Sequence, residues 1–411
     1  MKKNAVVRKR VLYTVDYCLT PLKVLDKCAV LQDNDRILAI GGVSAFTRDK
    51  DVDIYEFEDA YITPGFIDSH IHGAGGFDSS QAAAQPEMFA EMSTTLAQRG
   101  VTSFVPTVVA DSTDAMIANL DVLGKLCAST PPGAEALGIH MEGPFLNRLK
   151  AGSMMHDSMK EIDLGLVRAF IAAAAGKLIK MTFAPELENS EKLVELLIEN
   201  NILPSMGHSI ADDKSTLRAI DAGARCVTHL FNGMPPLHQR DQSLTSVALT
   251  DERVAIELIL DGMHLNPRIV DMACRCKPIG KVIGISDAVQ AAGLPDGNYT
   301  IGPTEIVVKN GSSHTTKGVL AGTTQLLDRS WRELTSYSHM KATSAAACVT
   351  INPAATLNIT DRGNLQPGKR ADFAIFSKTT NLPLMTVRCG EIVYNAGAEN
   401  YRFTQGHQQD Q

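Results

Sequence analysis

The sequence predicts an α/β fold in which a (β/α)8 TIM barrel carries a small β-sandwich domain. Through the middle of the chain, short apolar runs alternate with helix-like stretches, a pattern typical of parallel βαβ units. Eight such runs can be counted, which favours a closed barrel over an open sheet. Further β-rich segments lie at both ends. We therefore expect residues 1–61 and 366–411 to pair into one small domain, around a barrel domain of residues 62–365.

Composition limits the function classes that fit the chain. Its 411 residues are 44% hydrophobic and 21% charged, with a formal net charge of −7, which argues against a nucleic-acid or anionic-membrane binder. No run approaches the ~20 apolar residues that span a bilayer, and no apolar signal-peptide core follows the basic residues 1–11. We expect a cytoplasmic protein whose eight scattered cysteines are reduced and buried.

The two ends of the chain each show strand patterns interrupted by turns. Near the start, Ala29–Gln32 and Arg36–Ile40 flank the turn residues 33–35, which predicts a β-hairpin. Near the end, Ala371–Ser377 and Leu384–Val393 follow a Gln-Pro-Gly-Lys turn at 366–369. These segments supply the strands of the expected small domain.

The eight predicted barrel strands share an apolar, β-branched character and lie between helix candidates such as Ser190–Asn200 and Ile210–Ala222. They are Ile62–His70, Val101–Thr107, Ala136–Glu142, Ile179–Ala184, Ile202–His208, Arg225–Leu230, Val254–Asp261 and Lys281–Ser286. In such a barrel, catalytic residues belong at the C-terminal ends of the strands, where the βα loops form the active-site face.

Metal-binding side chains recur at these strand ends. His70 and His72 are two residues apart, so in an extended strand both face the same side and can bind one ion. A lone histidine at a strand end is usually a packing residue, but the pattern repeats around the predicted barrel. The further candidates are Glu142, His208, His229 and Asp287.

This set can hold one or two divalent ions. His70, His72 and Asp287 would bind one ion and His208 with His229 the other, with Glu142 shared between them. Nitrogen and oxygen donors without thiolate suit Zn²⁺ or Fe²⁺. A divalent ion lowers the pKa of bound water from ~16 to ~7, and Asp287 would take up the proton and pass it to a leaving nitrogen. The sequence thus predicts hydrolysis of an amide or imine.

These residues in this order resemble the amidohydrolase superfamily, and the neighbouring segments resemble its N-acetylglucosamine-6-phosphate deacetylases over nearly the whole chain. The matching segments carry the strand-end residues in characteristic surroundings. They are Thr63–Gly73, Gly138–Phe145, Gly207–Ser209, Thr228–Met234, Asp261–His264 and Ser286–Ala288.

The resemblance also implies substrate contacts and an assembly. Asn232 and Gly233 would bind the sugar or its phosphate. Arg240 and His264 would hold the 6-phosphate, with the arginine reaching in from a neighbouring subunit of a homodimer or a dimer-based tetramer. A planar guanidinium suits phosphate geometry.

Two departures from the family pattern affect these expectations. Where the family commonly has a carbonyl-polarising histidine after Lys-Gly-Ala, this chain has Met154, and His156 follows two positions later. Either the loop is remodelled so that His156 serves, or the metal polarises the carbonyl alone. The Arg-Glu-Pro-Gly run of the family is here Arg240 followed by Asp-Gln-Ser, so the loop that carries Arg240 can sit differently.

The leading hypothesis is therefore deacetylation of N-acetylglucosamine 6-phosphate to glucosamine 6-phosphate and acetate. One alternative is the same reaction on the galactosamine epimer. Another is a different amidohydrolase activity, such as that of an aminoacylase or deaminase. The last is a catalytically silent assembly protein, although such proteins usually lose metal ligands and none is missing here.

Overall fold

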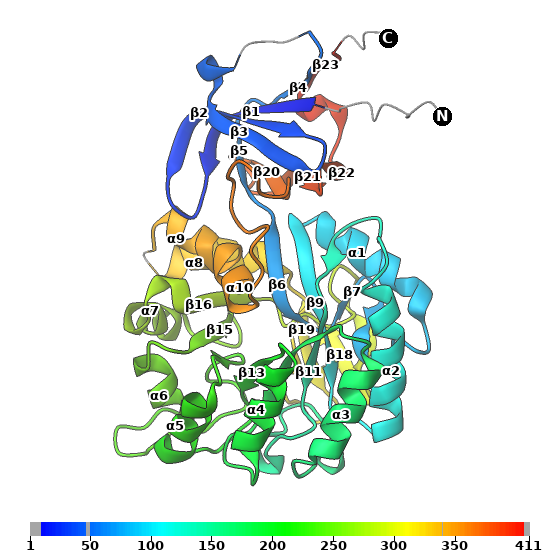
Figure 1. The fold of residues 1–411 in the computed structure, drawn as a ribbon, viewed down its shortest axis with the longest axis vertical. Helices are drawn as coiled ribbons and strands as arrows, with labels where there is room; N and C mark the ends of the chain where they lie inside the picture. Colours follow the sequence, from blue (N-terminus) through cyan, green and yellow to red (C-terminus); the bar gives the residue numbers. More distant parts are fainter. Residues whose placement is uncertain (1–9, 47–49, 339, 407–411) are drawn as a thin grey trace.

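The computed structural model describes residues 10–46, 50–338 and 340–406. It has two parts, a barrel with its surrounding helices and a smaller β-sheet domain stacked on one end of it (Figure 1). The first and the last described strands, β1 and β23, both lie in the small domain, so the barrel is inserted between its two halves. The predicted fold class is confirmed.

The small domain is built on one branched sheet, here called the terminal sheet. The strand β1 pairs with β2 along one edge, and with β4 and β5 in succession along the other. Antiparallel pairing of β20 with β5 joins the C-terminal half to the N-terminal half. The strands are β1 (Arg10–Leu19), β2 (Val24–Asp33), β3 (Arg36–Gly42), β4 (Asp53–Glu56), β5 (Ala60–Pro64), β20 (Phe373–Ser377), β21 (Pro383–Arg388), β22 (Glu391–Asn395) and β23 (Arg402–Thr404).

Two strands predicted as continuous are each divided by a glycine. The predicted strand Ile62–His70 is split at Gly65 into β5 of the terminal sheet and β6 (Phe66–Ile71) of the barrel. A Cβ at Gly65 would lie 2.2 Å from the Thr102 hydroxyl, so only glycine fits this crossing. Likewise Leu384–Val393 forms β21 and β22, which are separated by a turn at Gly390 with φ 77°.

The barrel contains all eight predicted strands in parallel order. A backbone hydrogen bond from the Asp287 N–H to the His70 carbonyl, 3.0 Å, links the end of the last strand to the first. The strands are β6, β9 (Val101–Val109), β11 (Ile139–Glu142), β12 (Leu178–Phe183), β13 (Leu203–Met206), β14 (Cys226–Val227), β15 (Ala255–Ile259) and β16 (Val282–Ile285), and the two-residue β10 (Glu135–Ala136) pairs with β9.

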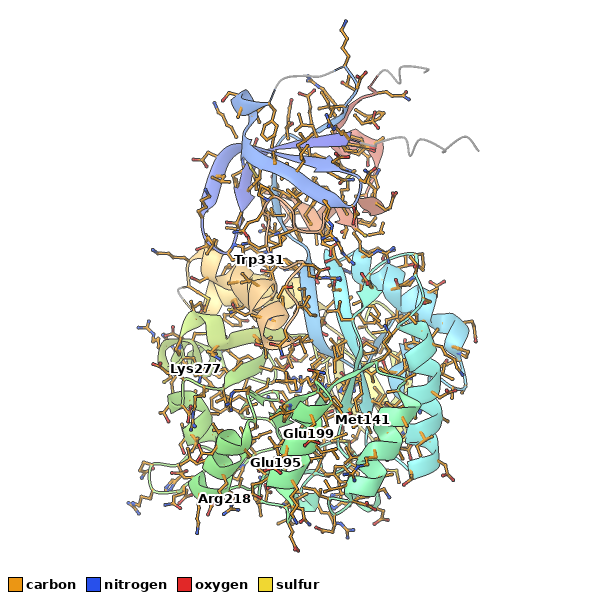
Figure 2. All side chains as sticks on the ribbon, in the orientation of Figure 1. Met141, Glu195, Glu199, Arg218, Lys277 and Trp331 are labelled. Carbon is orange, nitrogen blue, oxygen red and sulfur yellow. A yellow bond between two sulfur atoms is a disulfide. The ribbon has the colours of Figure 1, made fainter. Side chains whose placement is uncertain are left out.

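Helices surround the barrel and pack apolar faces against it. In α4 (Ser190–Glu199), Leu193, Val194 and Leu197 are buried, whereas Glu195 and Glu199 face solvent (Figure 2). This spacing is that of an amphipathic helix. The other helices are α1 (Phe89–Ala97), α2 (Thr113–Leu126), α3 (Leu164–Ala173), α5 (Asp213–Ala222), α6 (Leu244–Thr250), α7 (Pro267–Cys276), α8 (Leu327–Tyr337), α9 (Ala342–Cys348) and α10 (Ile351–Thr356).

The barrel core continues into the small domain. The main apolar cluster contains Tyr61 and Phe376 of the terminal sheet as well as residues of the barrel. Trp331 of α8 lies at this junction (Figure 2), and its ring centre is 6.5 Å from that of Phe66. A shared core makes the two parts one packed unit.

An additional three-stranded sheet between the last barrel strand and α8 was not predicted. It consists of β17 (Gly297–Ile301), β18 (Thr304–Lys309) and β19 (Ser312–Thr315). Its buried side chains Ile301 and Ile306 join a separate apolar cluster that includes Met154. This sheet therefore supports one wall of the barrel mouth.

The expectation that all cysteines are reduced is wrong for one pair. Cys18 of β1 and Cys28 of β2 form a disulfide across the two antiparallel strands. Their Cα atoms lie 5.7 Å apart, within the usual range for such a bond. Separately, no helix in the described part of the chain combines the length and apolar character needed to cross a bilayer.

Candidate metal centre and substrate pocket

The six predicted metal ligands lie at one end of the barrel. His70 is in β6 and Glu142 is the last residue of β11, while His208, His229 and Asp287 each follow a strand by two residues. All of them are buried, with His72 beside His70. Parallel strands end on the same side of a barrel, so residues far apart in sequence converge there.

Glu142 occupies the centre of this group. Its Oε1 lies 2.7 Å from His229 Nε2 and 3.1 Å from His208 Nε2. Its Oε2 faces the opposite side, 3.4 Å from His72 Nε2 and 3.7 Å from His70 Nε2. The carboxylate thus spans both halves of the cluster, the arrangement expected of a shared ligand.

Asp287 completes the half that contains His70 and His72. Its Oδ1 lies 3.0 Å from His72 Nε2 and 3.2 Å from His70 Nε2. Two groups of three residues therefore each place their ligand atoms within 4.8 Å of one another, His70 with His72 and Asp287, and Glu142 with His208 and His229.

The carboxylates of this cluster are held in their ionised form. Burial raises the pKa of Glu142. The charge of His70 and the hydrogen bonds from His208 and His229 to Glu142 outweigh that effect, and they bring the pKa of Glu142 well below its ordinary value. Burial likewise raises the pKa of Asp287, and His72 with His70 lowers it to about 2. Both groups are thus available as anionic ligands at neutral pH.

The backbone at these positions is strained. His208, His229 and Asp287 all have positive φ, at 46°, 28° and 51°, a region that non-glycine residues rarely occupy. Such strain persists only where the surrounding structure enforces it, and it is concentrated at functional sites. Here it turns three side chains toward one point.

Among the described residues, buried imidazole nitrogens in this cluster lack the hydrogen bonds that burial normally demands. His70 has no partner at either ring nitrogen, and His72 and His229 have none at Nδ1. The orphaned Nε2 of His70 faces the carboxylates of Glu142 and Asp287, an arrangement that matches a cation rather than a hydrogen-bonded core. The donor set of four imidazoles and two carboxylates fits a divalent metal ion of the zinc or iron type.

The His208 ring is held in its orientation by the Lys150 carbonyl and by the close approach of Gly233. Its Nδ1 lies 2.6 Å from the carbonyl oxygen of Lys150, so Nδ1 carries the proton and Nε2 is left for the cluster. A Cβ on Gly233, which has φ 63°, would lie 2.8 Å from that ring nitrogen. Glycine at this position is therefore required for the ring to fit.

A cavity of about 240 Å³ opens directly onto the cluster, slightly smaller than the ~300–1,000 Å³ usual for small-molecule sites. Three predicted substrate residues, Asn232, Gly233 and His264, line it. The His264 ring is fixed by Asp261, whose Oδ2 lies 2.8 Å from His264 Nδ1.

The cavity also has apolar lining residues, most of which the sequence did not predict. They include Met154, Ile301, Val319 and Leu320. The last three come from the unpredicted three-stranded sheet and the segment that follows it. Their signal was weak, because short strands with half-exposed side chains lack a clear alternation of apolar and polar residues.

Two predicted substrate residues lie outside this cavity. His156 is exposed in a short 3-10 turn, His156–Ser158, and Met154 lines the cavity instead. Arg240 is exposed on the loop before α6 and does not contribute to the lining. None of the described lining residues is a lysine or arginine.

With this geometry established, the comparison with known proteins is decisive. The sequence model of the amidohydrolase family matches residues 61–396. The chain belongs to this family. The match covers the barrel and four strands of the terminal sheet, β5 and β20–β22, and it includes all six residues of the buried cluster.

Within the family, this amidohydrolase is similar to sugar-phosphate deacetylases. It is 32% identical to the N-acetylgalactosamine-6-phosphate deacetylase of Escherichia coli O157:H7 over 82% of this chain and 89% of that protein. It is 31% identical to the N-acetylglucosamine-6-phosphate deacetylase of Bacillus subtilis over 86% of this chain and 91% of that protein.

A solved structure shows the same likeness in three dimensions. The N-acetyl-D-glucosamine-6-phosphate deacetylase of Mycobacterium smegmatis, solved as a variant in complex with N-acetyl-D-glucosamine-6-phosphate, superposes with a TM-score of 0.87 at 28% identity. The alignment covers 94% of this chain and all of that chain.

Proposed function

We propose that this amidohydrolase removes the acetyl group from N-acetylglucosamine 6-phosphate, giving glucosamine 6-phosphate and acetate. The observation that carries the proposal is the cluster of six convergent nitrogen and oxygen donors at the base of a small cavity. The chain is about 30% identical over most of its length to deacetylases of this substrate class. Both point to hydrolysis of a small amide.

The cluster would hold one or two divalent ions. His70, His72 and Asp287 would bind one, and His208 with His229 the other, with Glu142 between them. When bound, such an ion supplies a water ligand of near-neutral pKa and polarises the amide carbonyl. Zinc and iron are the candidates that fit this donor set.

A side chain of the protein would transfer the proton from the attacking water to the leaving nitrogen. Asp287 would accept the proton of the attacking water and transfer it to the amide nitrogen, so that an amine leaves while the acetyl carbon keeps the new oxygen as acetate. This transfer matters because an amine anion is too basic to leave unprotonated. Its buried, ionised carboxylate lies in the cluster, where the attack takes place.

The substrate would lie with its acetyl group toward the cluster. Asn232 and the backbone at Gly233 would contact the sugar, and His264 would reach the phosphate. Arg240 is exposed and outside the cavity of its own subunit, so it would act on the phosphate of a neighbouring subunit. A homodimer or a dimer-based tetramer is required for that contact. The cytoplasmic location predicted from the sequence stays a prediction.

The galactosamine epimer is the second candidate substrate. It is favoured by the 32% identity with an enzyme named for that sugar phosphate. Because the two sugars differ at a single stereocentre, the metal cluster and the acetyl chemistry would be unchanged.

Acetate release by the metal-loaded protein tests the proposal. The substrates are N-acetylglucosamine 6-phosphate, its galactosamine epimer, unphosphorylated N-acetylglucosamine and an N-acetyl amino acid. We expect turnover of a phosphorylated sugar that stops on chelation and is at least about tenfold weaker without the phosphate. Preference for the amino acid would indicate an aminoacylase, and no turnover together with no bound metal would indicate a non-catalytic relative.

A further inference from the structure

A buried ion pair lies inside the barrel next to the cluster. Lys180 of β12 and Glu257 of β15 are both almost fully inaccessible, at 0% and 1% exposure. Lys180 Nζ donates to Glu257 Oε1 at 2.5 Å, and the Ser69 hydroxyl donates to the same oxygen at 3.0 Å. Side chains of β6 and β12 thus hold a carboxylate that is carried by β15.

The second oxygen of this carboxylate faces a predicted metal ligand. Glu257 Oε2 lies 3.5 Å from His70 Nδ1, on the side of the ring opposite Nε2. Within the described residues, neither Oε2 nor Nδ1 makes a hydrogen bond to anything else. Two buried and unsatisfied polar atoms of complementary character therefore face each other just beyond ordinary hydrogen-bond length.

Stability alone is a poor explanation for this pair. Removing two charges from water costs several kcal/mol per ion, and apolar residues of similar size usually replace a buried pair without loss. The surrounding barrel interior is otherwise able to accept apolar side chains, as Ile259 and Ile283 show nearby. The pair faces the cluster at the Nδ1 of His70.

We propose that Glu257 is a positioning residue that accepts the Nδ1–H of His70, and that Lys180 holds the Glu257 side chain in place. This inference rests on the proposed metal site. A histidine ligand whose second nitrogen donates to a carboxylate has a fixed tautomer and ring orientation and becomes more basic at the bound nitrogen. His70 Nε2 would thereby present its lone pair toward Asp287 and Glu142.

The effect should be specific to one half of the cluster. His208 is oriented by the Lys150 carbonyl instead, and Nδ1 of His72 and of His229 has no hydrogen-bond partner among the described residues. Loss of the Lys180–Glu257 pair should therefore weaken the ion held by His70, His72 and Asp287. The ion held by His208 and His229 should be affected much less.

The double variant Lys180→Met/Glu257→Met tests this, since it removes both charges together and takes away the oxygen that faces His70 Nδ1. Metal affinity is measured by competition with a chromophoric chelator, using Zn²⁺. We expect the more sensitive ion to bind 10- to 100-fold more weakly, with kcat lowered and KM little changed. The metal-free variant should melt at or above the temperature of the metal-free parent.

The matched control is Arg370→Met/Asp372→Asn, which removes another buried ion pair, 2.8 Å long, far from the cluster. It should leave metal affinity unchanged whatever it does to stability. Parental affinity in a folded Lys180→Met/Glu257→Met protein would overturn the inference. A wild-type protein that binds no metal would instead overturn the proposed function, so the two failures are distinguishable.

A measurement on the unaltered protein covers the case in which the double variant does not fold. In the metal-loaded protein, the ¹⁵N-histidine spectrum should show His70 protonated at Nδ1, with that proton shifted far downfield and protected from exchange. Protonation at Nε2, or rapid exchange of the Nδ1 proton, would overturn the inference.

Discussion

At the scale of single residues, Asp287 has both a specific side-chain environment and an unusual backbone conformation. It is a buried carboxylate in contact with His70 and His72, and its backbone is held at φ 51°. The Asp287→Asn variant keeps the shape but cannot carry the proton. We expect kcat to fall by roughly 10²- to 10⁴-fold, measured as acetate release. Glu195→Gln, on the exposed face of α4, is the control and should match the parent (Figure 2).

Single substitutions also test whether Met154 or His156 contacts the substrate. Met154 lines the cavity, whereas His156 is exposed outside it. We expect Met154→Ala to lower kcat/KM about tenfold, equivalent to ~1.4 kcal/mol of lost contact. His156→Ala should stay within about twofold of the parent in the same assay. A large loss from His156→Ala would show that the loop moves to bring this histidine to the substrate.

Sequence alone could predict the strand-end cluster because its logic is local. An HxH pair faces one side of a strand, and a parallel barrel gathers all strand ends, so Glu142 and His229 could be placed without coordinates. The partners of Glu257 could not be found in this way. Lys180 and Ser69 lie on other strands, and which interior side chains meet depends on the stagger of the strands.

At the scale of elements, the N-terminus of α5 allows a test of how much a capping side chain contributes to the free energy of unfolding. Asp212 caps α5 by accepting a hydrogen bond from the Ser215 N–H at 2.8 Å, just after the loop that carries His208. Asp212→Ala should lower the free energy of unfolding by about 1 kcal/mol, measured in urea. The exposed Asp114 lies in the first turn of α2 without capping it, so Asp114→Ala should cost less. Equal losses would contradict a capping role.

The pH dependence of that cap has a definite sign. The hydrogen bond from Ser215 lowers the pKa of Asp212 below its ordinary value. A lowered pKa in the folded state means that the stabilisation is present above the unfolded pKa of ~3.9 and is lost as the pH falls through the folded value. The difference between parent and Asp212→Ala should therefore be constant from pH 5 to 8 and shrink only below about pH 4.

Strands and helices with a strong periodic pattern of apolar residues could be predicted from the sequence. A strand boundary that depends on a single glycine could not. Apolar runs marked all eight barrel strands, and α4 showed its amphipathic spacing. The break at Gly65 depends on the close approach of Thr102 from another strand, which no local pattern encodes. The sheet of β17–β19 escaped prediction because its strands expose many of their side chains.

At the scale of the whole molecule, a buried charge cluster joins the two parts. Arg370, next to β20, contacts Glu135 of the barrel and lies 2.8 Å from Asp372, while Arg362 reaches Glu135 at 3.2 Å. Arg370→Met would leave both carboxylates with fewer partners. We expect a loss of about 3–5 kcal/mol in the free energy of unfolding. Unchanged stability in thermal and urea unfolding would contradict this role.

The metal cluster also bears on the stability of the whole fold, because its six residues come from five different barrel strands or the loops after them. An ion that binds only the folded state stabilises it by RT ln(1 + [L]/Kd), about 4 kcal/mol when the free ion is at 1,000 times Kd. Chelation should therefore lower the Tm in differential scanning calorimetry, and Zn²⁺ should restore it while Mg²⁺ does not. Complete metal loss without any change in Tm would show that the barrel closes without its ion, and that the strained positions of His208, His229 and Asp287 are maintained by packing alone.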